Sequence, residues 1–287
     1  MGVVADLLAG AYAAAATGVH EPVDLQGLLR FRDDGRDVTV YGLILVFLFA
    51  GSLTLTCGGL ATAGRQRLIV NGANLAVKLT LLAAVIFMLA FPDLSQFDGK
   101  SLTYRAVLYP LLACLIPALY RLRAMRSPYP TLTDLCLSFT LVLDIVSNDL
   151  HYYGTWTDWD DIVHFWNSIP FIVVVAAPLL ALDRQGTIRL GFWAASFFAL
   201  TTYATLHSFW EMEEFLLDRY AGTNLQPGGM EEATGNTLAG LGGAVLGTAM
   251  LWFWRFEGAL NLCVSDPLAA FFNQLKPARS EKSSPVR

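Results

Sequence analysis

Residues 162–182 read IVHFWNSIPFIVVVAAPLLAL, a run that contains no acidic residue, lysine or arginine. A helix of about 20 mostly apolar residues spans the hydrocarbon core of a bilayer, so this run predicts a transmembrane helix. Six further segments resemble it in length and composition, although charged residues interrupt three of them: 38–60, 68–91, 102–120, 131–147, 190–210 and 233–254. Alternating strand patterns are absent. The sequence therefore predicts an all-α, polytopic transmembrane helical bundle of about seven spans.

The composition of the whole chain supports this interpretation. Of its 287 residues, 55% are hydrophobic and 15% are charged, whereas soluble domains carry about 25% charged residues. The formal net charge is −5. These values exclude a disordered chain, a collagen and a nucleic-acid binder with a basic face, so we expect membrane lipids and no nucleic acid as partners.

The two ends of the chain differ from the predicted bundle, which occupies residues 38–256. Residues 1–37 start with a short apolar stretch, for which we expect a surface helix and a polar connector; insertion of residues 1–18 would add an eighth span. Residues 257–287 predict an amphipathic and then disordered tail. The loops on the C-terminal side carry seven arginines, against three basic residues near the opposite loops, so we expect a cytoplasmic C-terminus.

Polar side chains gather at the ends of the last four predicted spans, within residues 131–254. They are Asp144, Asn148 and His151; Asp161, His164 and Ser168; His207, Glu211, Glu214 and Asp218; Glu231, Glu232 and Asn236. Spacings of three and four place the members of each group on one helix face. Successive spans run in opposite directions, so all four groups lie in one leaflet. Gly243 and Gly247 have GxxxG spacing, which favours the close helix packing that would bring Asn236 near the other groups.

These polar residues predict a functional site, because a charge at the bilayer centre costs about 2.5–3.5 kcal/mol on insertion scales. The candidate catalytic residues are Asp161, His164, Glu211, Glu214 and Asn236. Imidazole and carboxylate ligands suit zinc, iron or manganese, and the candidate ligands are His151, His164, His207, Glu211 and Glu214. A metal-bound water can attack an ester or phosphoester; without a metal, carboxylate–histidine pairs perform acid–base catalysis.

Other charged residues have a structural interpretation. We expect Asp158 and Asp160 to be solvated in a loop or at the membrane interface. Asp144 fits equally well a functional role and a hydrogen bond that joins helices. Lys78 and Arg105 are expected to reach an interface or to pair with an acid.

Three stretches, HYYGTWTDWDDIVHF (151–165), HSFWEMEEF (207–215) and MEEATGNTLAGLGGAVLG (230–247), resemble the YjdF-like family of uncharacterised bacterial inner-membrane proteins. A fainter similarity runs to the VanZ-like family. The resemblance covers about residues 140–250 and implies a site at His151, Asp161, His164, Glu211, Glu214 and Asn236. Before Asn236 this chain has glutamates where the family usually has aspartates. The resemblance implies a bacterial inner-membrane location, and the VanZ-like similarity points to envelope lipids or lipid-linked precursors.

The leading functional hypothesis is a membrane-embedded enzyme, a hydrolase or lipid-modifying enzyme, that acts on a lipid or lipid-linked substrate near the extracytoplasmic face. A proton- or ion-coupled transporter is the alternative, but it should carry polar groups deep in both leaflets. A third possibility is a non-catalytic envelope accessory protein whose polar residues only join helices.

Overall fold

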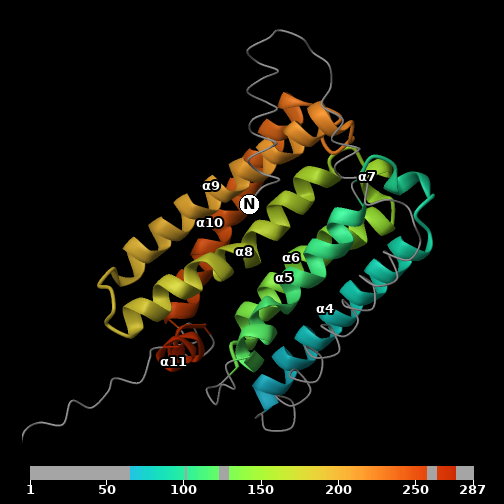
Figure 1. Cartoon of the computed structure of the whole chain (residues 1–287). Helices are drawn as coiled ribbons and strands as arrows, with labels where there is room; N and C mark the ends of the chain where they lie inside the picture. Colours follow the sequence, from blue (N-terminus) through green and yellow to red (C-terminus); the bar gives the residue numbers. More distant parts are fainter. Residues whose placement is uncertain (1–64, 101, 123–128, 257–263, 276–287) are drawn as a thin grey trace, which may run out of the picture.

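The computed structural model describes residues 65–100, 102–122, 129–256 and 264–275 (Figure 1). Within these ranges the chain forms helices and no strands. The long helices are α4 (Arg65–Ala90), α5 (Leu102–Leu122), α6 (Thr131–Asp149), α8 (Trp159–Arg184), α9 (Gly191–Ala221) and α10 (Met230–Phe256). The short ones are the 3-10 turn η1 (Ser95–Phe97), α7 (Tyr152–Thr155) and α11 (Asp266–Leu275). The predicted all-α bundle is therefore confirmed.

Four of the described helices are long and apolar enough to cross a membrane: Ile69–Ala90, Thr131–Asp149, Trp159–Arg184 and Met230–Phe256. Helix α5 contributes a shorter apolar stretch, Arg105–Tyr120. Helix α9 has 31 residues and ends in a charged segment. The predicted span 38–60 and residues 1–18 lie outside the described residues, so the number of spans stays a prediction.

The long helices alternate in direction, which places the polar groups at one end of the bundle. Helices α6 and α9 end there, and α8 and α10 begin there (Figure 1). We call this the site end. Helix α11 lies at the opposite end, where it packs on α8 (Figure 1). The shared end of the four polar groups was predicted from the antiparallel order of the spans, and the structure confirms it.

Among the described helices, α8 and α10 pack on each other most extensively, because glycines remove the side chains between them. A methyl group at Gly243 would overlap the backbone carbonyl of Phe165, and one at Gly247 would come within 2.8 Å of the carbonyl of Ile169. Both carbonyls belong to α8. The predicted role of the GxxxG spacing in close packing is confirmed.

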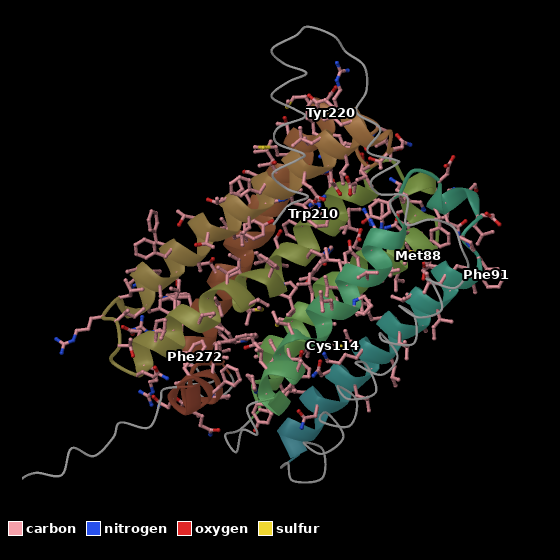
Figure 2. The ribbon with its side chains drawn as sticks, in the orientation of Figure 1. Met88, Phe91, Cys114, Trp210, Tyr220 and Phe272 are labelled. Atoms are coloured by element: carbon pink, nitrogen blue, oxygen red, sulfur yellow. The ribbon has the colours of Figure 1, made fainter. Side chains whose placement is uncertain are left out.

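Two apolar clusters stabilise the bundle. One joins α8, α9, α10 and α11 and includes Ile172, Leu251 and Leu268; Phe272 of α11 packs against it (Figure 2). The other joins α4, α5 and α6 around Leu81, Met88 and Ile145. Trp210 of α9 packs against this second cluster and so connects the two halves of the bundle (Figure 2).

Candidate functional site

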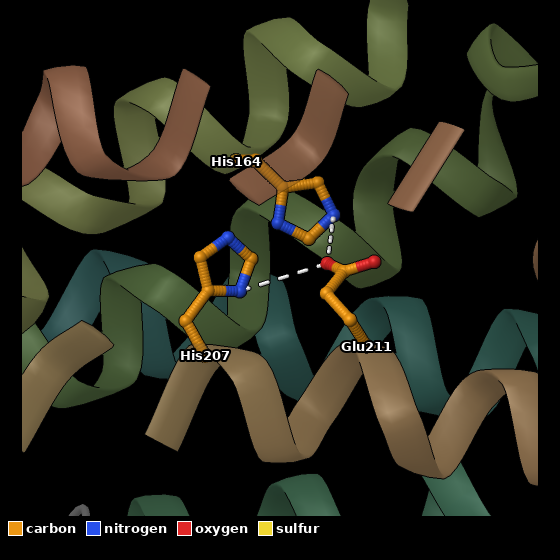
Figure 3. A group of neighbouring side chains, drawn as sticks. All are labelled: His164, His207 and Glu211. Atoms are coloured by element: carbon orange, nitrogen blue, oxygen red, sulfur yellow. Dashed lines mark ion pairs between the residues drawn. The ribbon is translucent and has the colours of Figure 1, made fainter. Parts of the chain in front are cut away.

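Three side chains from two helices meet at the site end (Figure 3). His164 belongs to α8, whereas His207 and Glu211 lie one turn apart on α9. Glu211 Oε1 is 3.6 Å from His164 Nε2 and 3.6 Å from His207 Nδ1. The two imidazole rings are stacked, with their centroids 4.9 Å apart. One ligand atom from each residue lies within 4.8 Å of the others, a separation that suits shared coordination of an ion.

The hydrogen-bond partner of His207 Nε2 indicates which ring nitrogen carries the proton. Its Nε2 lies 3.0 Å from the backbone carbonyl of Asn236, which only accepts, so Nε2 carries the proton. In the neutral ring Nδ1 then presents a lone pair toward Glu211. Gly240 makes this position available, because a methyl group there would overlap the His207 ring. Metal-bound histidines commonly have such a carbonyl partner on the distal nitrogen.

Glu211 is oriented by a loop that sequence reasoning had not singled out. The amide Nε2 of Gln226 donates to Glu211 Oε2 at 2.7 Å and to the Glu211 backbone carbonyl at 3.1 Å. Asp218 holds the loop in place, since its carboxylate accepts the backbone N–H groups of Leu225 at 2.8 Å and Gln226 at 2.7 Å. These bonds leave Glu211 Oε1 directed at the histidines.

Three buried acceptor atoms at this site receive no hydrogen bond from the described part of the chain: Glu211 Oε1, Gln226 Oε1 and Asn236 Oδ1. Their residues are 6%, 4% and 0% exposed. An unsatisfied buried acceptor costs about 1–3 kcal/mol. A group of such acceptors beside an imidazole lone pair is therefore a place for a cation or a strong hydrogen-bond donor.

The carboxylate beside His164 comes from Asp160 and not from the predicted Asp161, so the expectation that Asp160 is solvated is wrong. Asp160 Oδ1 lies 3.5 Å from His164 Nε2, and Asp160 Oδ2 accepts a 2.8 Å hydrogen bond from Asn236 Nδ2. Asp161 is exposed and lies against Gly235 of α10, where a methyl group would come within 3.0 Å of its Oδ1. Residues at both i−3 and i−4 share a face with His164, and the spacing alone did not separate them.

Glu214 is held by Arg105 and is separate from the two histidines. Its Oε1 lies 3.8 Å from Arg105 Nη2, while Arg105 Nη1 lies 2.7 Å from Asp144. Asp144 also accepts hydrogen bonds from Tyr109 and from Tyr153, the latter at 2.8 Å. Burial raises the pKa of Tyr153, which keeps the phenol a neutral donor. This network joins α5, α6 and α9, so Asp144 has the helix-joining role that was one of its two interpretations.

His151, like Glu214, is a predicted ligand that the structure does not place in the group of His164, His207 and Glu211. It lies between α6 and α7 with a positive φ of 59°, and its ring lies against Gly154, where a methyl group would overlap it. A left-handed backbone at a non-glycine residue marks a turn. His151 therefore shapes the connection between the helices, although the sequence spacing placed it on the face of Asp144.

A cavity of about 950 Å³ opens at this cluster and is lined by α5, α6, α8, α9 and α10. His164, His207, Glu214 and Asn236 lie in its wall together with Arg105. Farther from the site end the wall is mainly apolar, formed by Leu108, Leu112, Leu137, Leu141, Phe171 and Leu206, with the hydroxyl groups of Thr140, Ser168 and Tyr203 among them. The cavity is thus charged at one end and mainly apolar at the other.

Lys100 lies at the mouth of this cavity, in the segment before α5. Its Nζ is 5.7 Å from the centre of the Tyr153 ring. Burial and the nearby Arg105 lower the pKa of Lys100, while Asp160 and Glu214 act in the opposite direction. The cavity wall therefore contains two neighbouring cations, of which Arg105 is paired with Asp144 and Glu214.

A second buried ion pair lies in the other half of the bundle. Lys78 Nζ is 3.0 Å from Asp134 Oδ1, and both side chains are fully buried. Asn74 and Tyr129 donate to Asp134 Oδ2 at 2.7 and 2.8 Å, and Lys78 also donates to the Ala113 carbonyl at 2.6 Å. Lys78 and Arg105 were both expected to reach an interface or to pair with an acid, and both pair with an acid.

The fold and site define a polytopic helical membrane protein whose histidines and carboxylates are buried at one end of the bundle. Comparison with protein-family models matches residues 74–257 to a family described as "Predicted membrane protein (DUF2238)". The match covers more than half of the chain, so the chain belongs to this family. It is compatible with the resemblance to YjdF-like proteins and gives no support to the VanZ-like similarity. No curated protein and no solved structure matches.

Proposed function

We propose that this protein is a membrane-embedded enzyme that hydrolyses or otherwise modifies a lipid or lipid-linked substrate, with His164, His207 and Glu211 at the reacting centre. The observation that carries the proposal is that His164 and His207 line a cavity with a polar and a mainly apolar part, while Glu211 lies behind them within 3.6 Å of both rings. Such a cavity suits an amphiphile whose polar part reaches the histidines while its chain stays in apolar surroundings.

The proposed centre holds a divalent ion, with zinc, iron and manganese as candidates. Ligand atoms around tetrahedral zinc, at bonds of about 2.0–2.1 Å, lie roughly 3.3 Å apart; the two measured separations here are 3.6 Å. The orienting bonds are also in place, since Asn236 and Gln226 hold His207 and Glu211. A bound ion of this kind lowers the pKa of a coordinated water and polarises an ester or phosphoester.

In this proposal Asp160 works beside the centre. Its carboxylate faces His164 Nε2 and is fixed by Asn236 Nδ2. That places a base next to the histidines, where it can take a proton from an attacking water and return it to the leaving alcohol. Asn236 contacts both residues: its backbone carbonyl accepts a hydrogen bond from His207 Nε2, and its side-chain Nδ2 donates to Asp160.

In α8, α9 and α10 the ionisable groups of the site gather at one end, which favours the enzyme over the transporter; the buried Lys78–Asp134 pair near the start of α6 belongs to the other half of the bundle. Beyond the cavity, the described parts of α8, α9 and α10 are packed around buried apolar residues such as Ile172, Ala177 and Ala199. Alternating access requires a polar route that continues past the midplane. We further propose a bacterial inner-membrane location, with the site end on the extracytoplasmic face and the C-terminus in the cytoplasm, as the arginine distribution predicts.

The test combines metal analysis with product detection. The full chain is purified in detergent, metal content is measured, and the protein is reconstituted into liposomes of total bacterial lipid whose composition is followed by mass spectrometry. We expect about one divalent ion per chain and a lipid product that increases with time; Glu211→Gln and His164→Ala should abolish the product. Asp93→Asn, an exposed acid in the loop after α4, is the charge-matched control. A wild-type protein that leaves every lipid unchanged would contradict the proposal.

A further inference from the structure

The apolar end of the cavity reaches the outer surface of the bundle. Leu206 of α9 lines the cavity and is also 46% exposed. On the other side, Leu108 and Leu112 of α5 line the cavity while Leu111, between them, is 52% exposed. The apolar wall therefore reaches the exposed surface of the bundle at Leu206.

Helices α5 and α9 flank this part of the cavity without packing extensively on each other. Helix α5 packs on α4 and α6, whereas α9 packs on α8 and α10. Near the site end they are linked by the Arg105–Glu214 pair and by Trp210, which reaches the α4–α6 cluster. Below these links, α6 and α8 form the back of the cavity through Leu137 and Phe171.

The charges around the cavity come from different elements. The two cations, Lys100 and Arg105, come from the segment around the start of α5, and Arg105 is paired there with Asp144 and Glu214. The other acids come from the start of α8 and of α10: Asp158, Asp160, Asp161, Glu231 and Glu232. A headgroup that carries both a phosphate and an ammonium group matches this distribution, with the phosphate toward Lys100 and the ammonium toward the acids of α8 and α10.

The excess of acids adds a reason for a positive group in the ligand. Lys100 and Arg105 are outnumbered in the cavity wall by Asp144, Glu214 and the acids of α8 and α10. An anionic headgroup alone would meet this surplus of acids without a compensating cation. A zwitterionic headgroup supplies its own cation.

Resting on the proposed function, we infer that the substrate is an amine-bearing zwitterionic phospholipid that enters from the bilayer between α5 and α9. Its acyl chain lies against Leu112, Leu137 and Phe171, and its ammonium group lies among the acids of α8 and α10. Lateral access explains why the apolar wall extends to Leu206 at the lipid-facing surface.

The test measures lipid retention, which does not depend on turnover. The full chain in detergent is offered phosphatidylethanolamine and phosphatidylglycerol with identical acyl chains, and bound lipid is quantified by native mass spectrometry. We expect about a tenfold preference for phosphatidylethanolamine, equivalent to roughly 1.4 kcal/mol. Equal retention of the two lipids, or a preference for phosphatidylglycerol, would overturn the inference.

Variants locate the binding. Leu137→Trp fills the apolar end, and Leu206→Trp narrows the access at a half-exposed position that tolerates a larger side chain; each should lower phosphatidylethanolamine retention about tenfold. Leu115→Trp, at a 48% exposed site on α5, is the size-matched control and should retain lipid like the wild type. Unchanged retention in both cavity variants would refute the site.

One further variant separates the two proposals. Glu211→Gln should keep phosphatidylethanolamine retention within about twofold of the wild type, because the chain and most of the acidic wall are intact. Selective retention without any product from the wild type would reject the enzyme and keep the lipid site. A lipid product without selective retention would keep the enzyme and reject the selective lipid site.

Discussion

Replacing Gln226 by leucine removes the side-chain amide that donates to Glu211 Oε2, the two atoms being 2.7 Å apart. The second contact of this amide, to the Glu211 backbone carbonyl at 3.1 Å, is lost as well. What is left for the carboxylate is the long contact from Asn236 Nδ2 at 3.5 Å. Glu211 then has no fixed orientation, although all three proposed ligands are still present.

The expected loss of metal affinity follows from these bonds. Removing a group that orients a metal ligand lowers affinity by about 10–100-fold, which corresponds to roughly 1.4–2.7 kcal/mol. A hydrogen bond to a charged group contributes about 1.5–3 kcal/mol. The two estimates agree, so we expect the dissociation constant for zinc to rise about 10–100-fold in Gln226→Leu.

The assay is competition for zinc between the metal-free, detergent-purified protein and a chelator of known affinity. Gln96→Leu is the matched control, since Gln96 Nε2 donates to the backbone carbonyl of Asp149 at 3.0 Å, outside the cavity wall. Thermal unfolding without metal reports the purely structural effect of each change. A zinc affinity of Gln226→Leu within about twofold of the wild type, or an equal loss in Gln96→Leu, would refute the orienting role.

Three further outcomes follow from the described contacts. Asp134→Leu should lower the free energy of unfolding by about 3–5 kcal/mol, because it leaves the Lys78 ammonium group buried without a carboxylate partner. Adding Lys78→Met should recover most of this loss, as measured by unfolding in detergent. Equal stability of the single and double variants would contradict the role of this ion pair. Gly243→Ala should lower the melting temperature and the zinc affinity by forcing α10 away from α8, whereas Gly242→Ala, whose methyl group meets a ring at an ordinary 3.6 Å, should be tolerated. His151→Asn, which keeps a residue that accepts the left-handed backbone, should bind zinc like the wild type; a lost ion would restore His151 as a ligand.

The sequence was sufficient for the architecture and for the end of the bundle at which the polar groups meet. Span-length apolar runs are a strong signal because the bilayer leaves backbone groups no other partner. Once the helices alternate, the ends of α6 and α9 and the starts of α8 and α10 must share a side. His164, His207 and Glu211 came together for that reason, and the glycines of α10 supplied the close approach.

The finer choices depended on side-chain geometry that periodicity does not encode. Asp160 and Asp161 are both within one turn of His164, and the rotation of α8 against α10 decides which carboxylate faces inward. The seven-residue spacing predicted that His151 shares a helix face with Asp144. Helix α6 ends at Asp149, however, and the next turn directs the His151 ring elsewhere. Gln226 lies in a loop without a repeat, placed by hydrogen bonds to Asp218. The i,i+4 spacing between Asp160 and His164 could have identified Asp160 from the sequence, whereas no sequence pattern pointed to Gln226.

The distribution of charge around Glu211, and not only the number of acids, supports the proposed divalent ion. Residues 144–164 and 211–232 hold 11 of the 24 acids and one of the 19 basic residues, so the mild net charge of −5 conceals a strongly acidic segment in a basic chain. Arg105 comes from outside these stretches and compensates Asp144 and Glu214. It does not reach Glu211, whose Oε1 has no donor and faces the lone pair of His207. Two acceptors held at 3.6 Å in a buried site repel each other unless a positive charge or a proton lies between them, and that requirement is what the proposed divalent ion satisfies.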